Sequence, residues 1–159
     1  PLSTLIFDVD HFKQVNDNHG HAVGDEVLRE LAQRVANGAR SFDLVARIGG
    51  EEFAVVLPDS GLDTAISVAE RLRKSCESRP FRVSGPVGEL NVTISIGVAY
   101  ATSPDENPLE LLKRADEGLY MAKRSGRNRV CTIEDLEQAR QDESQIGSQA
   151  SETENPAPA

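Results

Sequence analysis

Apolar residues recur along the chain in two spacings, one typical of β-strands and the other of amphipathic helices. The strand-like runs are rich in β-branched and aromatic residues and are separated by polar or glycine-containing turns. They occupy residues 2–9, 42–48, 53–57, 90–101 and 128–132. The first run ends in acidic residues, and we expect it to be a central strand. A short run at residues 81–84 is expected to pair with the run at 90–101 as a hairpin.

The helix-like segments alternate with these runs. Their apolar residues lie three or four positions apart, which places them on one face of a helix. The expected helices span residues 12–19, 25–37, 64–78 and 108–125. We interpret Gly20–Gly24 as a break and Asp25 as the N-cap of the second helix. The order of elements predicts the α/β (α+β) class, with a ferredoxin-like, mainly antiparallel five-stranded sheet and flanking helices.

Composition narrows the possible classes of protein. The chain has 159 residues, of which 38% are hydrophobic and 27% charged, which is ordinary for one globular domain with a core. The net charge of −9 and the aromatic content of 4% argue against a nucleic-acid-binding groove. We find no apolar run that would span a membrane and no signal peptide. Cys76 and Cys131 lack metal-ligand spacing, so we expect reduced thiols in a cytoplasmic protein.

Most of the negative charge lies at the C-terminus. Residues 134–159 contain seven acidic residues and one arginine, whereas residues 1–133 are nearly balanced in charge. We therefore expect one domain at residues 1–133 and an acidic tail at 134–159. The tail can start as a helix, but its Ser, Gln, Glu, Pro and Ala content predicts disorder further along.

Residues 47–53, Arg-Ile-Gly-Gly-Glu-Glu-Phe, join two expected strands. Two glycines indicate a tight hairpin, because such turns often need a positive φ. Without side chains at Gly49 and Gly50, the backbone amides would be open to a bulky anion. Glu51 and Glu52 follow, and their oxygens suit a hard cation. For this turn alone, a solvated hairpin with acidic residues at its rim is the favoured alternative.

Acidic residues also end the first expected strand. If this strand lies beside the hairpin, Asp8 and Glu51 meet at one edge of the sheet and would form a Mg²⁺ site. Asp8 follows apolar residues, and an unpaired buried carboxylate would be unfavourable there, so a metal partner is favoured. We interpret Asp10 as the N-cap of the short helix that follows, and not as a ligand.

Further polar residues have two interpretations each. Asn16 and Asp25 together can bind the edge of guanine, although both are also ordinary residues at helix ends. Lys123 and Arg127 flank the end of the last long helix, where they can bind phosphate or complement the helix dipole. Lys13 can face the same phosphates.

Together these segments resemble the GGDEF family of diguanylate cyclases, in its Gly-Gly-Glu-Glu-Phe variant, over residues 2 to about 132. Beside the signature loop, matching motifs lie at residues 8–17, 20–25, 91–97, 115–123 and 126–128. The segments look most like the output domain of a PleD-type response regulator. The resemblance implies a nucleotidyl-cyclase palm fold and the condensation of two GTP into cyclic di-GMP and pyrophosphate. It also implies Mg²⁺ or Mn²⁺ as cofactor, with two ions per half-site.

The resemblance further implies a role for each matching residue. The metal ligands would be Asp8, the carbonyl group of Val9, and Glu51. The catalytic groups would be Glu51, Glu52 and Lys13. The substrate would be bound by Asn16 and Asp25 at guanine, by Gly49 and Gly50 at the backbone, and by Lys123 and Arg127 at the phosphates. An inhibitory site for the product would consist of Arg40, Asp43 and Arg71.

One departure from the family concerns the N-terminus. The family carries an Asp-x-Leu-Thr-Gly-Leu-x-Asn-Arg helix before the first strand, usually after a receiver or sensory domain, and this chain lacks it. We therefore expect the catalytic core of a larger regulator, active as a homodimer. The alternatives are a non-catalytic receptor that binds cyclic di-GMP at Arg40 and Asp43, and a cyclase acting on one nucleotide. The retained Glu51 and Glu52 argue against the first alternative, and the inhibitory motif argues against the second.

Overall fold

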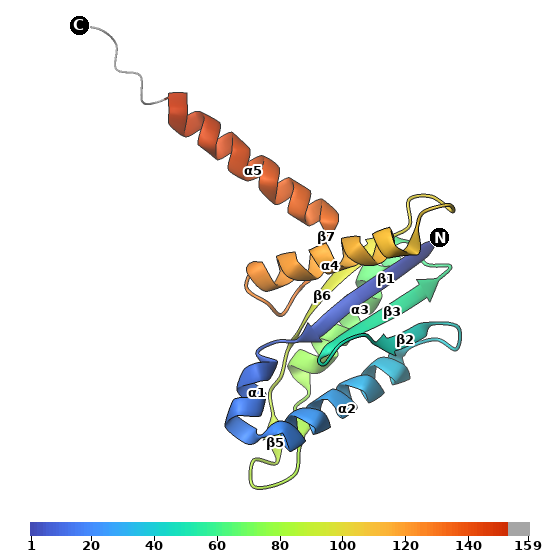
Figure 1. The fold of residues 1–159 in the computed structure, drawn as a ribbon, viewed down its shortest axis with the longest axis vertical. Coiled ribbons are helices and arrows are strands. Elements are labelled where there is room, and N and C mark those ends of the chain that lie inside the picture. Colours follow the sequence, from blue (N-terminus) through green and yellow to red (C-terminus); the bar gives the residue numbers. More distant parts are fainter. Residues whose placement is uncertain (153–159) are drawn as a thin grey trace, which may run out of the picture.

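A five-stranded sheet forms the centre of the structure (Figure 1). The computed structural model describes residues 1–152 of the chain. The strands lie in the order β2-β3-β1-β6-β7, and all neighbouring pairs are antiparallel except β6 and β7. Their bounds are Leu2–Val9 (β1), Leu44–Arg47 (β2), Glu52–Pro58 (β3), Ile94–Tyr100 (β6) and Val130–Thr132 (β7). The expected fold class and the central position of the first strand are thus confirmed.

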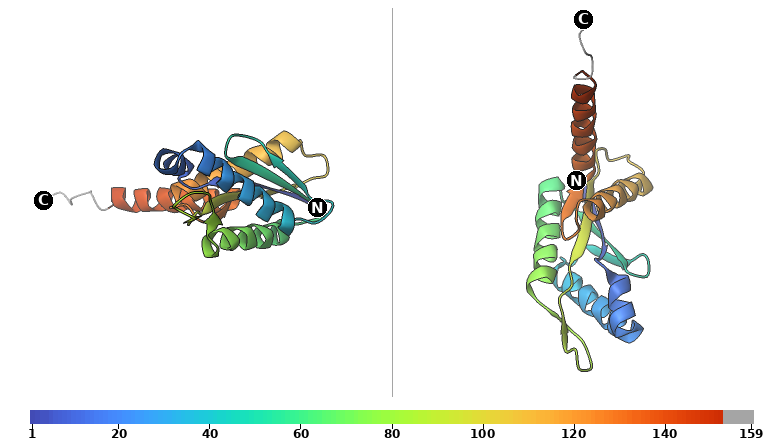
Figure 2. Two further views of the ribbon diagram at one scale, coloured as in Figure 1. Left: turned by 90° about the horizontal axis from the view of Figure 1, so that it is seen from below. Right: turned by 90° about the vertical axis from the view of Figure 1, so that its left-hand side faces the viewer.

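Helices cover both faces of this sheet. Helices α2 and α3 lie against one face, and α4 crosses the other (Figure 2). The helix bounds are Phe12–His19 (α1), His21–Gly38 (α2), Leu62–Ser78 (α3) and Pro108–Arg124 (α4). The start of α4 follows its sequence signal: Asn107 accepts a hydrogen bond from the Leu109 amide at 3.0 Å, and a proline follows the cap.

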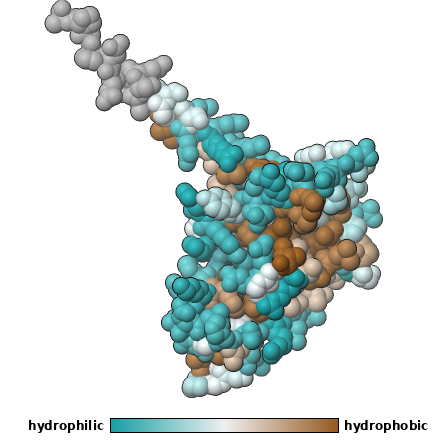
Figure 3. Space-filling model, viewed as in Figure 1, coloured by the Kyte–Doolittle hydropathy of each residue, from teal (hydrophilic) through white to brown (hydrophobic). Residues whose placement is uncertain are grey.

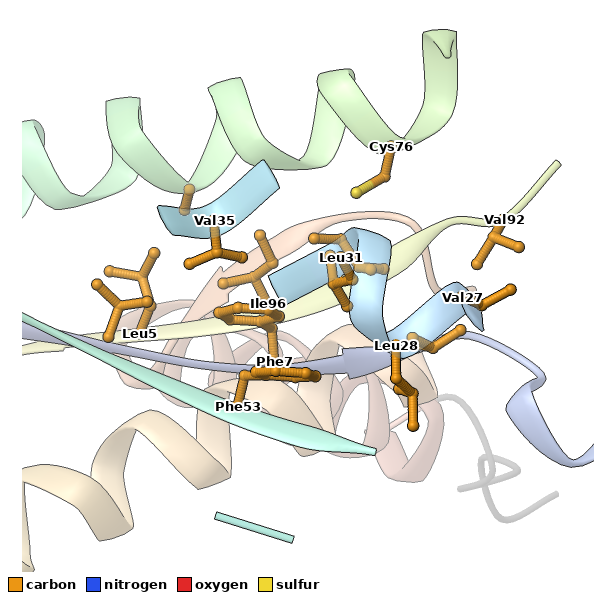
Figure 4. Packing of buried hydrophobic residues seen from close by; sticks show 14 of the residues in the cluster. Leu5, Phe7, Val27, Leu28, Leu31, Val35, Phe53, Cys76, Val92 and Ile96 are labelled. Atoms are coloured by element: carbon orange, nitrogen blue, oxygen red, sulfur yellow. The ribbon is translucent and has the colours of Figure 1, made fainter. Parts of the chain in front are cut away.

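The larger core lies between the sheet and helices α2 and α3. Side chains alternate between the two faces of a strand, so Leu5 and Phe7 of β1 both point into this core. Phe7 stacks on Phe53 of β3 with ring centroids 5.5 Å apart (Figure 4). Val27 and Leu31 of α2 complete the contact and are fully buried. This packing fixes the register of β1 against β3, which in turn determines how the polar ends of the two strands meet.

Helix α4 packs very closely against the opposite face of the sheet. A Cβ atom on Gly97 of β6 would lie 1.9 Å from the carbonyl oxygen of Ala115. A Cβ atom on Gly118 of α4 would lie 2.7 Å from the carbonyl oxygen of Cys131. Any side chain at these two positions would push α4 away from the sheet. The two glycines therefore hold α4, and the basic residues at its C-terminal end, close to β1.

The expected start of α2 is wrong. The helix begins at His21, so Gly20–Gly24 is not a break and Asp25 is not the N-cap. Gly20 alone separates α1 from α2, and its φ of 87° provides the change of direction without a clash. Asp25 instead lies inside α2, with its side chain exposed.

The hairpin expected over residues 81–101 is divided into two parts. Strands β4 (Phe81–Arg82) and β5 (Glu89–Leu90) pair with each other in a separate ribbon, while β6 joins the main sheet. Carboxylates of α2 explain the separation. Glu26 and Glu30 each accept a hydrogen bond of 2.8 Å from a backbone amide of the ribbon, and so hold it against the helix.

The segment after β7 forms a long helix, α5 (Ile133–Glu152), which projects from the domain (Figure 1). The expected helical start of the tail is thus present, and the helix continues to Glu152, further than the composition indicated. Thr132 and Asp135 form a capping box, with the Thr132 amide donating to Asp135 at 2.7 Å and the Asp135 amide donating to Thr132 at 3.3 Å. The residues that follow the capping box favour a helix, because many of them are Glu, Gln, Ala or Arg. Residues 153–159, the rest of the expected disordered tail, lie outside the described residues.

The edge strand β2 is exposed along its whole length. Leu44 and Ile48 are 65% and 51% exposed, and apolar surface gathers beside α4 over β2 and β3 (Figure 3). Both ends of β2 are therefore accessible, one leading from Asp43 and the other leading into Gly49. Within residues 1–152, no helix has the length and apolar character needed to cross a membrane.

Candidate active site

The C-terminal end of β1 carries a buried carboxylate. Asp8 is 3% exposed and lies opposite Glu52 of β3 in the strand register. Its Oδ2 atom forms an ion pair with Lys123 of α4. Its Oδ1 atom is buried and has no hydrogen-bond partner among the described residues. A buried carboxylate oxygen without a partner is unfavourable, so this atom is suited to a ligand such as a cation.

Negative charge accumulates around this carboxylate. Burial raises the pKa of Asp8, and Lys123 opposes the rise. Burial is also the main reason that the pKa of Glu51 is raised, and the charge of Asp8 adds to it. The pKa of Glu52 is raised by burial first, and then by the charges of Asp116 on α4 and of Asp8. The pKa values of these acids stay raised although Lys123 opposes the rise, so the acids are compensated only in part, which favours a further cation at this edge.

The acidic side chains do not form a complete metal site by themselves. Among the described residues, no three histidine, cysteine or acidic side chains converge closely enough to hold an ion. A backbone oxygen is the remaining kind of donor, and the carbonyl group of Val9 lies next to Asp8 at the end of β1. The oxygens of Asp8, Val9 and Glu51 are of the kind that a hard cation prefers, and Asp8 and Val9 lie together at the end of β1.

The Gly-Gly turn joins β2 to β3 as expected, but not through left-handed glycines. Neither Gly49 nor Gly50 has a positive φ. The turn is closed instead by the Ile48 amide, which donates to the Glu52 carbonyl at 2.9 Å. Arg47 donates from Nε to the carbonyl oxygens of Gly49 at 3.2 Å and Gly50 at 3.0 Å. A Cβ on Gly50 would meet nothing within 4 Å, so the surface beside the turn is open.

Arg47 was not among the residues singled out from the sequence. Its position two residues before the glycines was the available signal, but a charged residue at a strand end is usually solvated. Arg47 also borders a hollow of about 490 Å³ between α2 and the hairpin, together with Asp25 and Phe53. The hollow has room beside the turn for a planar ring.

Asn16 and Asp25 are brought together by the packing of α1 on α2. The Oδ1 atom of Asn16 is buried and has no hydrogen-bond partner among the described residues. A Cβ on Gly24 would lie 1.9 Å from this oxygen, so only glycine allows Asn16 to occupy its place. Asp25, the next residue, is exposed and free of ion pairs within the described part of the chain. Asn16 thus places a buried amide oxygen beside Gly24, and Asp25 provides an accessible carboxylate one residue further along α2.

The three basic candidate residues differ in whether they contact the acidic end of β1. Lys123 contacts Asp8 directly. Arg127 is exposed in the turn after α4, and its charge slightly opposes the rise that burial causes in the pKa of Asp8. Lys13 is exposed on α1 and forms no ion pair among residues 1–152. The structure therefore brings Lys123 and Arg127 to the acidic edge, but shows no such contact for Lys13.

The interpretation of Asp10 as an N-cap is wrong. His11 occupies the N-cap position of α1, with a φ of 56° and no capping side chain. Asp10 is 6% exposed and accepts hydrogen bonds from the hydroxyl groups of Thr93 at 2.7 Å and Ser95 at 2.6 Å. It also accepts one from the amide of Asn128 at 3.0 Å. An Asp followed by a helix gives the same sequence signal in both cases, so only tertiary packing separates the two roles.

Arg40 and Asp43 form an ion pair of 3.0 Å just before β2. Arg40 also donates to the Ser60 hydroxyl at 2.7 Å and to the Pro58 carbonyl at 3.2 Å. Its Nη1 atom has no hydrogen bond among the described residues. Arg71 of α3 lies across a hollow of about 460 Å³ that Asp43 also lines. The structure thus shows a salt bridge between Arg40 and Asp43, beside a cavity that Asp43 and Arg71 border.

A mainly antiparallel palm, with acids at the end of its central strand and an open glycine turn beside them, is the architecture of the nucleotidyl-cyclase class. The family described as diguanylate cyclase, GGDEF domain, matches residues 1–129. The chain belongs to this family.

Curated relatives agree with this assignment. The chain is 52% identical over 130 residues to the response regulator PleD of Caulobacter vibrioides, a match covering 82% of this chain and 29% of PleD. It is 46% identical over 129 residues to diguanylate cyclase A of Treponema denticola, covering 81% of this chain and 34% of that protein. The chain thus spans about a third of the length of these relatives.

Solved structures show the same fold. The GGDEF domain of DgcB from Caulobacter crescentus, in complex with c-di-GMP, superimposes with a TM-score of 0.79 and 35% identity, covering 84% of this chain and 78% of that one. The active GGEEF domain of a diguanylate cyclase from Vibrio cholerae gives a TM-score of 0.75 and 36% identity, covering 82% and 81%. The second structure carries the same signature variant as residues 49–53.

Proposed function

We propose that this domain is a diguanylate cyclase, which joins two GTP molecules into cyclic di-GMP and releases two pyrophosphates. The observation that carries the proposal is the pair of buried oxygens without partners, Oδ1 of Asp8 and Oδ1 of Asn16. In an otherwise well-packed domain, such atoms mark places where a ligand supplies the missing interaction. One atom suits a cation and the other suits a hydrogen-bond donor of a base.

The metal is assigned to the end of β1. Asp8, the Val9 carbonyl and Glu51 would hold Mg²⁺ or Mn²⁺, with two ions in each half-site. When bound, these ions would polarise the phosphate and lower the pKa of the attacking 3′-hydroxyl group. Glu51 would also lie close enough to the attacking group to accept that proton as a general base. Glu52 adds negative charge beside it.

The nucleotide would lie along the open side of the Gly49–Gly50 turn. Asn16 and Asp25 would bind guanine, with the carboxylate accepting from N1–H and the 2-amino group. Lys123 and Arg127 would hold the phosphates, and Lys13 would join them after a change of rotamer. Lys123 would then exchange its ion pair with Asp8 for contact with the triphosphate.

Two half-sites are needed because the product contains two phosphodiester bonds between two nucleotides. Each domain would hold one GTP, so two domains would face each other as an antiparallel homodimer. We assign the chain as the output domain of a signalling regulator, in which an N-terminal receiver or sensory domain would control this pairing. The reaction rate per protein should therefore rise with protein concentration. A rate independent of dilution, in a species shown to be monomeric, would contradict the dimer.

The product would also act as an inhibitor. Arg40, Asp43 and Arg71 would bind cyclic di-GMP at the hollow between α2 and α3, where Arg40 offers its free Nη1 atom to a phosphate or to the Hoogsteen edge of guanine. Product bound there would hold two domains apart without touching the metal ligands.

One experiment tests the proposed activity. The protein is incubated with GTP and Mg²⁺, and the product is identified by its mass. Cyclic di-GMP with two equivalents of pyrophosphate is the expected result. A protein that binds cyclic di-GMP but forms none of it, at any protein concentration, would instead be the non-catalytic receptor.

A further inference from the structure

The turn after α4 has an unusual backbone. Gly126, Arg127 and Asn128 have φ values of 117°, 64° and 46°, so three consecutive residues have a positive φ. This conformation is unfavourable for Arg127, whereas asparagine adopts it more readily than most residues that carry a Cβ. Such a conformation persists where the surrounding structure over-determines it. The contacts of the turn therefore show what holds Arg127 in place.

The backbone of the turn is held at two points. The Arg127 amide donates to the Ala122 carbonyl at 3.0 Å, which closes the end of α4. The Asn128 amide donates to the Oδ2 atom of Asp10 at 3.0 Å. The first contact is local, whereas the second joins residues 118 positions apart in the chain. Asp10 is thus the tertiary anchor of the turn's backbone.

Asp10 is itself firmly held. Its other contacts are the hydroxyl groups of Ser95 and Thr93, and its own amide donates to the Thr93 carbonyl at 2.9 Å. Hydrogen bonds to an ionised carboxylate are stronger than those between neutral groups. Three of the roughly four acceptor positions of this carboxylate are occupied. Asp10 is therefore saturated by donors of the protein itself, unlike Asp8 two residues earlier.

The side chain of Asn128 provides a second anchor on α3. It donates to Glu77 at 3.1 Å and accepts from Arg73 at 3.0 Å. Arg73 in turn forms ion pairs with Glu70 and Glu77, each at 3.0 Å. The turn is thus clamped between the end of β1 and α3, with the exposed Arg127 between the two anchors.

We propose that Asp10 is a positioning residue, which clamps the left-handed turn through the Asn128 amide and so places Arg127 for binding the triphosphate. The inference rests on the proposed function, because Arg127 is a phosphate ligand only if the domain binds GTP. Asp10 follows Asp8 and the Val9 carbonyl, so the same strand end fixes the metal ligands and the phosphate-binding turn relative to each other.

The test uses Asp10→Asn, which keeps the shape of the side chain and removes its charge. The probe is a GTP analogue with a methylene bridge between the α and β phosphates, which cannot lose pyrophosphate. We expect Asp10→Asn to weaken its binding about tenfold, the effect of one lost charge-assisted hydrogen bond. Guanosine, measured as a competitor, should bind equally to both proteins because it has no phosphate. A general structural defect would weaken both ligands.

A double-mutant cycle shows whether Asp10 acts through Arg127. Arg127→Ala should weaken binding of the analogue by a similar factor. The double variant should then be no more than about twofold worse than Arg127→Ala alone, because neighbouring groups that act together are not additive. Fully additive effects, or unchanged analogue binding in Asp10→Asn, would overturn the proposal. Asp105→Asn is the matched control, since this exposed carboxylate has no hydrogen bond among the described residues.

Hydrogen exchange tests the clamp in the unmodified protein, whatever the stability of the variants. The Asn128 amide should exchange slowly although it lies in a turn, and Asp10→Asn should accelerate its exchange at least about tenfold. Fast exchange in the unmodified protein would overturn the clamp. A failure of the proposed function gives a different result: the unmodified protein would then not bind the analogue at all.

Discussion

The end of β1 and the start of β2 each place a basic side chain beside a buried carboxylate, but they differ in how far their polar atoms are satisfied. At the end of β1, Lys123 contacts one oxygen of Asp8 and the other has no partner among the described residues. At the start of β2, both oxygens of Asp43 accept hydrogen bonds from Arg40, one from its guanidinium group and one at 2.7 Å from its amide.

The difference shows which polar cluster needs a ligand. The Asp43 carboxylate is satisfied without one, and the Arg40 guanidinium also lies 4.5 Å from the centre of the Phe42 ring. The Asp8 cluster is incomplete, and three of its acids have a raised pKa because of burial and mutual repulsion. Removing charge should therefore damage function at β1 and stability at β2, and the following predictions test this contrast.

The largest effect is expected for loss of a metal ligand. Glu51→Gln and Asp8→Asn should each lower turnover of GTP more than about a hundredfold, because loss of a ligand exceeds the effect of losing its outer-sphere partners. Both variants should keep the native circular dichroism spectrum, since no apolar contact is lost. Glu110→Gln, an exposed change on the first turn of α4, is the control. A near-native rate in either variant would refute the metal assignment.

The next effect concerns the base. Asp25→Ala should raise the KM for GTP about 10- to 100-fold, the consequence of losing hydrogen bonds to a charged acceptor. ITP lacks the 2-amino group and serves as the matched substrate. The unmodified enzyme should prefer GTP over ITP, and Asp25→Ala should lose most of this preference. An unchanged ratio of the two kcat/KM values would rule out contact between Asp25 and the 2-amino group.

Much of this arrangement could be predicted from the sequence. The β-rich run at residues 2–9, which ends in acidic residues, predicted a central strand, and β1 indeed lies between β3 and β6. If that strand lies beside the hairpin, its acidic end meets the glycine turn. The pattern cannot give the distance between the two ends. That distance depends on the register fixed by Phe7 and Phe53, and on the close approach of α4 at Gly97.

The expectations for Asp10 and Asp25 are wrong because a capping signal in the sequence does not show what the residue contacts in the fold. In the structure, Asp10 is held by residues more than 80 positions away, and Asp25 lies inside a helix that begins at His21. Helix α5 follows from the capping box at Thr132 and from good helix formers, a local signal that the acidic composition obscured.

A smaller effect is expected at the start of β2. Arg40→Ala would leave the buried Asp43 carboxylate with one backbone donor, and should lower the free energy of unfolding by about 1–3 kcal/mol. Urea denaturation measures this loss. The same variant should weaken inhibition by cyclic di-GMP while the initial rate stays within a few-fold of the unmodified enzyme.

Arg71→Ala separates these two effects, because it removes the helper arginine and leaves the Arg40–Asp43 pair intact. It should weaken product inhibition with little change in stability. If Arg40→Ala is inhibited at the same product concentration as the unmodified enzyme, the site is not regulatory. If the free energy of unfolding of Arg40→Ala is unchanged, the hydrogen bonds from Arg40 to Asp43 do not stabilise the fold.

The smallest effect has the opposite sign and concerns Glu51 without metal. Burial and Asp8 raise the pKa of Glu51 in the folded state, so the folded protein binds this proton more tightly than the unfolded chain. Stability therefore falls as pH rises through the ordinary carboxyl range to the raised pKa, and the full penalty is present above both. Glu51→Gln removes the penalty. In buffer with a chelator, it should raise Tm slightly at pH 7.5, and the gain should vanish toward pH 4, where Glu51 is protonated. A lower Tm for Glu51→Gln at pH 7.5 would mean that the carboxylate stabilises the fold, as Asp43 does, and that the two regions do not differ in the way their hydrogen bonds indicate.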